Sequence, residues 1–542
     1  MMRLLERIEN MRLSLGEWLA GFLGVIAIRF FLETFSSPAA AFPAAPDVLT
    51  MVHYGLLFFV ILISLSLIIR LFVPEISKIT KFLLFGFPII WLPPIVDLVR
   101  SGGGGYGMAY LFLEPREFWY SMATFGGRGV FGGITPGIRT EIVCILVGIT
   151  WYVILKTRNL WKSLAAAVFS YVAIFFWLAL PSALAAITSA IQPTLIAADP
   201  LGILVGFFST SYIAGDIVRP VVQMAYGFAV GSIFNTGISL VLYIAACTML
   251  AAWLWAWRPG AARSFWKNAR PERMAHYFLL LALGIAIGVS RGQVLHGWFD
   301  AVVIADLGIV FIGAWLFAVT VNDIVDIPID AISNTGRPLI VGSLDVDTMK
   351  GLAIVMLSVS FIGAYLLGYW TLFLVTVFTA AYYIYSAPPL RLKRVPMIAT
   401  FLISIACLAT LMAGFYLTNA SKLISDFPHR LALIVVIGIT LGANIKDIKD
   451  VAGDRADGIM TIPAVFDGAL GRRIVGIFFA ASFLAVPIIL RSWPLFFPSL
   501  AAAAVGYGIV AFGAYREWKV FAVYFLFFAA AWVMYAIFPV PL

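Results

Sequence analysis

Two short stretches of the chain carry three aspartates each at the same spacing. VNDIVDIPID contains Asp323, Asp326 and Asp330, and KDIKDVAGD contains Asp447, Asp450 and Asp454. Each stretch follows a long apolar segment, and offsets of three and four residues place three carboxylates on one face of a helix. Carboxylates gathered at a membrane edge repel one another unless a cation neutralises them. The two triplets therefore predict a site for a hard divalent cation.

Mg²⁺ suits such a site, because it is commonly held by one or two carboxylates together with substrate phosphates. The bound metal would stabilise negative charge on a leaving diphosphate. Residues that could clamp the remaining phosphate oxygens lie near both triplets: Arg337, Tyr385, Arg391, Lys393, Arg394 and Lys446. Pro328 lies inside the first triplet and predicts a kinked or ended helix, so Asp330 is expected to swing at a helix-to-loop break.

The composition indicates an all-α integral membrane protein. Of the 542 residues, 62% are hydrophobic and only 12% are charged, against about 25% charged in soluble domains. Apolar runs of roughly 17 to 25 residues recur along the chain, which is the length that a membrane helix needs. Strands of a β-barrel would be shorter and would alternate between apolar and polar residues. The net charge of +9 comes mostly from short loops, where basic residues set topology, so nucleic acid is not an expected partner. The scattered cysteines and histidines predict neither a disulfide framework nor a zinc site.

Hydropathy divides the chain into two membrane domains. We expect an N-terminal multi-pass domain over residues 1–257, a basic cytoplasmic linker over 258–274 and a second domain over 275–542. The sequence predicts five to seven membrane helices in the first domain, where we find no group of residues that could form a catalytic site. The second predicts nine helices, near 275–290, 299–323, 350–368, 371–386, 396–418, 430–447, 473–490, 494–514 and 518–537. Basic loop residues concentrate on the side that holds the aspartates, which predicts that this side is cytoplasmic.

With these features in view, residues 270 to 542 resemble the UbiA superfamily of intramembrane prenyltransferases. NDIVDIPID followed by GRPL is similar to the first signature of the family, and KDIKDVAGDRADGIMTIP is similar to the second. YSAPPLRLKR resembles the basic loop between them. The resemblance implies a nine-helix bundle that uses Mg²⁺, and the cell membrane is the expected location because no organelle-targeting stretch is evident. Such a bundle would transfer a prenyl group from a polyprenyl diphosphate to a hydrophobic or aromatic acceptor, such as a lipid or a quinone precursor.

The resemblance also assigns roles to single residues. The expected metal ligands are Asp323, Asp326, Asp330, Asp447, Asp450 and Asp454. The expected catalytic residues are Asp323, Asp326, Asp447, Asp450, Arg337 and Lys393. The expected substrate-binding residues are Asn322, Tyr385, Arg391 and Lys446.

Two other functions stay open at this point. A CDP-alcohol phosphotransferase also uses aspartates at a membrane edge. Its signature, however, needs an Ala-Arg pair shortly after an Asp-Gly pair, whereas Asp457 and Gly458 are followed here by IMTIP. A transporter, or a lipid-handling protein with a domain that only binds diphosphate, would use intramembrane acids such as Asp306 as relay groups. Mg²⁺ dependence and diphosphate release distinguish a prenyltransferase from a carrier. The acceptor, the prenyl chain length, the oligomeric state and the role of residues 1–257 stay open.

Overall fold

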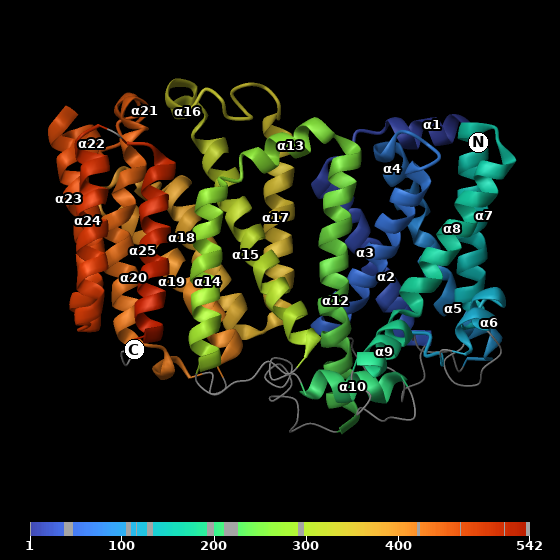
Figure 1. The fold of residues 1–542 in the computed structure, drawn as a ribbon. Coiled ribbons are helices and arrows are strands. Elements are labelled where there is room, and N and C mark those ends of the chain that lie inside the picture. Colours follow the sequence, from blue (N-terminus) through green and yellow to red (C-terminus); the bar gives the residue numbers. More distant parts are fainter. Residues whose placement is uncertain are drawn as a thin grey trace. The chain divides into compact units, whose positions relative to one another are not determined.

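The computed structural model consists of helices joined by loops, with no β-strand in the part of the chain that it describes (Figure 1). The chain folds as two compact units: unit 1, Met1–Ala262 with His296–Asp306, and unit 2, Arg263–Leu295 with Leu307–Leu542. Fourteen described helices are long and apolar enough to span a membrane, which confirms the expected all-α, multi-pass fold. The structure describes residues 2–36, 47–103, 110–114, 116–126, 134–191, 200–210, 226–290, 297–419, 423–466, 468–513 and 515–537.

Unit 1 contains six of the fourteen candidate spans, within the five to seven that the sequence predicts. Its helix α3 contacts α4, α8 and α12, while α7 packs on α5 and α8, and the short helix α1 lies on α4. The elements are α1 (Met2–Asn10), α2 (Leu15–Ser36), α3 (Val48–Arg70), α4 (Ile76–Gly86), η1 (Phe87–Trp91), α5 (Leu92–Arg100), α6 (Phe118–Ala123), α7 (Pro136–Thr157), α8 (Leu160–Leu178), α9 (Leu180–Ile191), α10 (Pro200–Thr210) and α12 (Tyr226–Trp257).

The described residues of unit 2 include the nine long helices that the sequence predicts. Eight of them are candidate membrane spans, and α18 is the ninth. The first turns of α15 belong to unit 1 and the rest to unit 2. The long elements are α14 (Pro271–Ser290), α15 (Trp298–Val325), α17 (Val346–Leu367), α18 (Tyr369–Ser386), α19 (Ile398–Thr418), α20 (His429–Gly442) with η4 (Ala443–Ile448), α23 (Gly468–Leu490), η5 (Trp493–Leu495) with α24 (Phe496–Ala511), and α25 (Glu517–Ile537). The short ones are α13 (Pro259–Lys267), α16 (Ile327–Ser333), η2 (Leu392–Arg394), η3 (Ile424–Asp426), α21 (Val451–Ala456) and α22 (Ile462–Val465).

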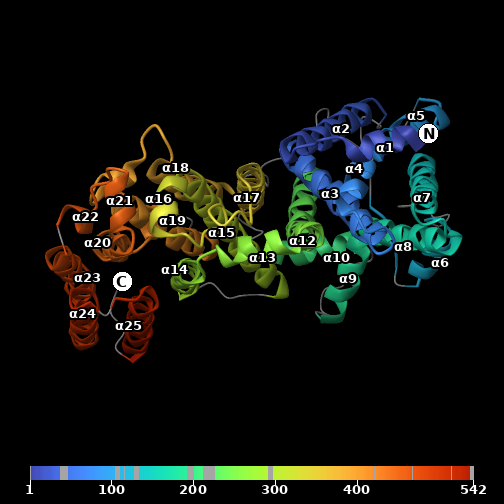
Figure 2. The same ribbon diagram turned by 90° about the horizontal axis from the view of Figure 1, so that it is seen from above.

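Seen from above, the helices of unit 2 follow one another round an arc from α17 and α18 to α24 and α25 (Figure 2). The first helix, α14, packs on α19 through small residues. A Cβ added at Gly284 would lie 2.1 Å from the carbonyl oxygen of Leu411, and one at Gly414 would lie 2.4 Å from that of Leu281. Glycine at these positions lets the two backbones approach closely, as in other membrane helix pairs.

Both aspartate triplets lie across a break in a helix. Helix α15 ends at Val325 and α16 begins at Ile327 with Pro328 in its first turn, where a missing N–H costs nothing. The second triplet is divided between η4 and α21. The break beside Pro328 agrees with the predicted kinked or ended helix, but Asp330 lies within α16 rather than at a helix-to-loop break. Helices α16 and α21 pack together at one end of the bundle (Figure 1).

Candidate active site

Asp323, the first acid of the first triplet, is held by residues that precede helix α14. The Asn268 amide donates to Asp323 Oδ2, and Arg270 Nη2 donates to Asp323 Oδ1 at 2.7 Å. Arg337 Nη1 donates to Asn268 Oδ1 at 2.8 Å. The Trp315 indole donates to the Ala269 carbonyl at 2.7 Å, which fastens this turn to α15. The Asp323 carboxylate, which is only 2% exposed, thus has the guanidinium of Arg270 and the amide of Asn268 as partners.

Asp326 lies at the break between α15 and α16 and is neutralised by the basic loop after α18. Lys393 Nζ donates to Asp326 Oδ1, and Arg391 Nη2 lies 3.2 Å from the same oxygen. Asn322 Nδ2 donates to Asp326 Oδ2 at 2.9 Å. Arg391 also pairs with Asp457 at 2.8 Å, and its φ of 44° is a conformation that non-glycine residues seldom adopt. The loop therefore holds Arg391 in a strained backbone conformation, and the guanidinium of this residue bridges Asp326 and Asp457.

Asn334 connects the two triplets. Its Nδ2 donates to Asp330 Oδ1 at 2.9 Å and to Asp450 Oδ1 at 3.0 Å. The other oxygen of Asp330 is buried without a hydrogen bond, and Arg337 Nε lies 4.0 Å from it. Burial, and then the negative charge of Asp323, raises the pKa of Asp330 to about 6. One amide therefore joins Asp330 of α16 to Asp450, which directly precedes α21.

The second triplet has fewer cationic partners than the first. Lys446 donates to Asp447 and also lies over the Tyr385 ring, 5.4 Å from its centroid. Asp454 accepts a hydrogen bond of 3.1 Å from the Thr461 hydroxyl. Burial, and then the charges of Asp447 and Asp450, raises the pKa of Asp454 to about 7. The acid at the end of each triplet is thus buried, and the only ion pair that the described residues give to either of them is the long one of 4.0 Å between Arg337 and Asp330.

The carboxylates fit a divalent cation in their chemistry. Among the described residues, no three acidic, histidine or cysteine side chains already converge as a metal centre. Protein cations hold Asp323, Asp326 and Asp447, whereas Asp330 has an oxygen without a hydrogen bond and Asp450 shares its amide partner. Hard oxygen donors from both triplets, at the point where Asn334 joins them, are the donor set that Mg²⁺ prefers.

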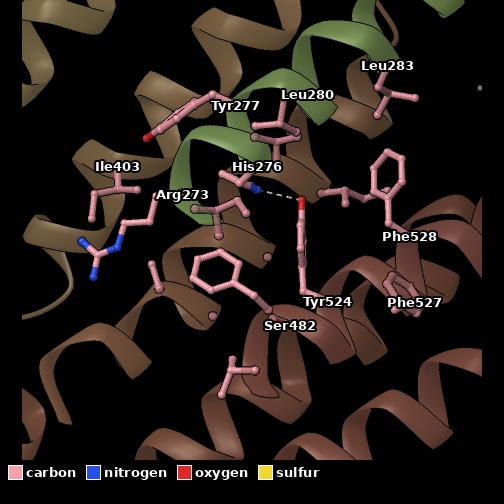
Figure 3. Close-up of a pocket in the computed structure, with 18 of the residues that line it drawn as sticks. Arg273, His276, Tyr277, Leu280, Leu283, Ile403, Ser482, Tyr524, Phe527 and Phe528 are labelled. Carbon is pink, nitrogen blue, oxygen red and sulfur yellow. Dashed lines mark hydrogen bonds between the residues drawn. The ribbon is translucent and has the colours of Figure 1, made fainter. Parts of the chain in front are cut away.

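An apolar cavity of about 490 Å³ extends into unit 2 beside these acids. Residues of α14, α15, α18, α19, α20, α23 and α25 line it, and its polar lining includes Arg270, Arg273, Asn322, Tyr385, Lys446 and Glu517. Figure 3 shows His276 of α14 and Tyr524 of α25 pointing toward each other, with His276 Nδ1 2.9 Å from the tyrosine hydroxyl. Glu517 accepts from Arg273 at 2.8 Å and from Lys449 at 2.5 Å. Hydrogen bonds between polar side chains therefore join α14 to α25, the first and last long helices of unit 2, at the wall of the cavity.

Three aromatic rings stand together in the wall of this cavity. Tyr277 and Trp315 have ring centroids 5.2 Å apart, and Tyr382 lies 5.7 Å from Trp315. Ring faces attract cations, so the cluster could shield a positive charge that forms in the cavity.

Every residue predicted for the site lies in unit 2 among these contacts, but the assigned roles stay predictions. Sequence reasoning missed five residues that join the site: Asn268, Arg270, Arg273, Asn334 and Glu517. Three of these, Asn268, Arg270 and Arg273, belong to the basic segment that the sequence predicts as a linker. The signal available there was the run NARPER, shortly before the membrane helix predicted from residue 275. Asn334 stands between the first triplet and Arg337, a position close enough to both to have been considered.

The C-terminal part of the chain is similar to known proteins. Residues 278–538 match the model of the UbiA prenyltransferase family. A digeranylgeranylglyceryl phosphate synthase of Methanopyrus kandleri is 25% identical over 255 residues, which are 45% of this chain and 86% of that protein. The bacteriochlorophyll synthase 33 kDa chain of Rhodobacter capsulatus is 29% identical over 178 residues, 31% of this chain and 57% of that protein.

The chain also aligns with solved structures. A UbiA homolog from Archaeoglobus fulgidus, bound to GPP and Mg²⁺, aligns with a TM-score of 0.41 and 16% identity over 50% of this chain and 99% of that one. A UbiA homolog from Aeropyrum pernix aligns with a TM-score of 0.39 and 18% identity over 48% of this chain and 98% of that one. By the match to the family model, residues 278–538 form a domain of the UbiA prenyltransferase family, and the long helices in this part of the chain are apolar enough to span a membrane.

Proposed function

We propose that the chain catalyses Mg²⁺-dependent transfer of a prenyl group from a polyprenyl diphosphate to a lipid acceptor, on the cytoplasmic side of the cell membrane. The observation that carries this proposal is the Asn334 bridge, which joins the two acidic triplets beside an apolar cavity of about 490 Å³. A diphosphate head and a long hydrocarbon tail need these two environments next to each other.

The residues of this chain would divide the work as follows. Asp330, Asp450 and Asp454, with the other three aspartates, would hold the metal, which when bound neutralises charge on the diphosphate oxygens. Arg337, Arg391, Lys393 and Lys446 would exchange their carboxylate partners for phosphate oxygens. The bond between the first prenyl carbon and diphosphate breaks, and the acceptor nucleophile bonds to that carbon and loses its proton. The Tyr277, Trp315 and Tyr382 rings would shield the allylic cation.

The acceptor is proposed from the relatives. The Methanopyrus kandleri relative and one from Methanoculleus marisnigri, 28% identical, are both named digeranylgeranylglyceryl phosphate synthases. Geranylgeranylglyceryl phosphate is therefore the first acceptor to test, with geranylgeranyl diphosphate as donor, and quinone precursors follow.

The test uses the full chain in detergent with Mg²⁺, donor and acceptor, and reads diphosphate release together with new lipid masses. We expect product in the wild type and at least about a 100-fold loss in an Asp323→Asn, Asp447→Asn variant. Asp347→Asn is the matched control, because that carboxylate is 96% exposed and pairs only at the surface with Lys350. Diphosphate that binds in calorimetry without ever being released, with every donor and acceptor tried, would contradict the proposal and favour a binding-only domain.

A further inference from the structure

Unit 1 encloses a second apolar cavity, of about 160 Å³. Its walls come from α3, α4, η1, α7 and α8. On α3 the lining runs from Tyr54 to Leu65, and on α7 from Ile138 to Ile149. Each range covers about three helical turns, or roughly 16 Å along the axis. The cavity is small for that length, so it is a narrow slot parallel to the helices.

Charged groups gather at one end of the slot. Arg29 and Glu33, four residues apart in α2, form an ion pair of 2.9 Å, and both are almost fully buried. Arg29 also donates to the Ile90 carbonyl at 2.7 Å. Ionisable groups inside a membrane bundle are costly and generally mark a functional site. Glu141 of α7 lines the slot within electrostatic range of this pair.

Glu141 determines which ligand the slot could hold. It makes no hydrogen bond or ion pair with any residue that the structure describes, whereas Glu33 already neutralises Arg29. An anionic headgroup would meet the Glu141 carboxyl group and a guanidinium that Glu33 already neutralises, so no free positive charge would balance it, which disfavours phosphates and fatty acids. A hydroxyl group can donate to Glu141 and adds no charge.

We propose that unit 1 binds an uncharged, single-chain lipid alcohol in this slot, with its hydroxyl group at Glu141 and its chain between α3 and α7. The site is independent of the prenyl transfer proposed for unit 2. Tyr110 and Tyr54 flank the polar end, with ring centroids 6.2 Å apart, and the Tyr110 hydroxyl is already bonded to His53 Nε2 at 2.9 Å. The carboxyl group of Glu141 is therefore the acceptor that the slot offers to a ligand.

The chain offers a matched pair of variants to test this site. A Cβ added at Gly148, which lines the slot on α7, meets no atom within 4 Å, so Gly148→Leu can fill the slot without a backbone clash. Gly55 of α3 has equally open surroundings but does not line the slot, so Gly55→Leu is the control. Both changes remove a helical glycine, and both variants should fold.

The probe is a long-chain alcohol with a diazirine in its chain, photolysed with the full-length protein in detergent and located by peptide mass spectrometry. We expect labelling of the α3 and α7 segments, a decrease of at least tenfold in Gly148→Leu, and wild-type labelling in Gly55→Leu. Glu141→Leu keeps an apolar slot without the acceptor and should weaken labelling about tenfold. Equal labelling in wild type and Gly148→Leu, or stronger labelling by the matching diazirine fatty acid, would overturn the proposal.

Discussion

At the residue scale, the predicted metal ligands are already paired with protein groups. Asp323 accepts from Asn268 and Arg270, Asp326 from Lys393 and Arg391, and Asp447 from Lys446. Paired charges offset the cost of burying acids at the membrane edge. Binding of a metal and a diphosphate would rearrange these pairs, with cations moving from carboxylates to phosphate oxygens.

Asn268 is the residue whose removal tests this view most directly, because it contacts both Asp323 and Arg337. We expect Asn268→Ala to lower kcat/KM for prenyl transfer about 10- to 100-fold and to raise the Mg²⁺ concentration for half-maximal activity. Lys267→Ala is the control, since Lys267 is exposed at the end of α13 and has no contact with the site. Wild-type Mg²⁺ dependence in Asn268→Ala would show that the turn before α14 does not support the first triplet.

At the element scale, the close contact of α14 with α19 sets the position of the cavity wall. The Gly284→Ala change would place a Cβ 2.1 Å from a backbone oxygen of α19, so the helices must separate. We expect a loss of about 1–3 kcal/mol in the free energy of unfolding, measured as a lower midpoint of thermal unfolding in detergent. Gly508→Ala in α24 is the control, because its Cβ meets nothing within 4 Å. A midpoint as high in Gly284→Ala as in that control would contradict the tight crossing.

We expect the length of α14 along the cavity to limit the prenyl chain that fits. Ala286 lines the cavity about 20 Å along the helix from Arg273, the distance covered by their separation in sequence. We expect Ala286→Phe to lower kcat/KM for a geranylgeranyl donor at least tenfold, with little effect on a geranyl donor, in a competition assay. Ala282→Phe, exposed on the same helix and outside the lining, serves as control. Equal losses with both donors in Ala286→Phe would mean that the tail lies elsewhere.

At the scale of the whole molecule, α15 belongs to both units, because its first turns pack within unit 1. Phe299 is 1% exposed, and its ring lies 4.7 Å from that of Phe208 and 5.9 Å from that of Phe207. A protease site inserted after Gly260 should therefore yield two fragments that elute together in size-exclusion chromatography. Phe299→Ala in the cleaved protein should weaken this association. If the two fragments eluted separately even with Phe299 intact, the contact made by the first turns of α15 would not be what holds the fragments together.

Much of this protein was predictable from local sequence. The nine helices of unit 2 follow from apolar runs of membrane length, because a backbone inside lipid must satisfy its own hydrogen bonds. The position of the aspartates at helix ends follows from the same runs. The helix break at Pro328 was predictable too, since proline lacks a backbone donor. What local patterns missed was the restart of the chain as α16, which buries Asp330.

Only the tertiary structure decided which groups meet. Asn268 reaches Asp323 across 55 positions of the chain, and Asn334 reaches Asp450 across 116. No periodicity relates residues so far apart, because their approach depends on how α14, α15 and η4 pack. The Arg29–Glu33 pair needs only the one-turn spacing of two residues in the same helix, yet the slot beside it exists only because α3, α4, α7 and α8 surround it. Residue types and helices follow from the chain itself, whereas partners and cavities follow from packing.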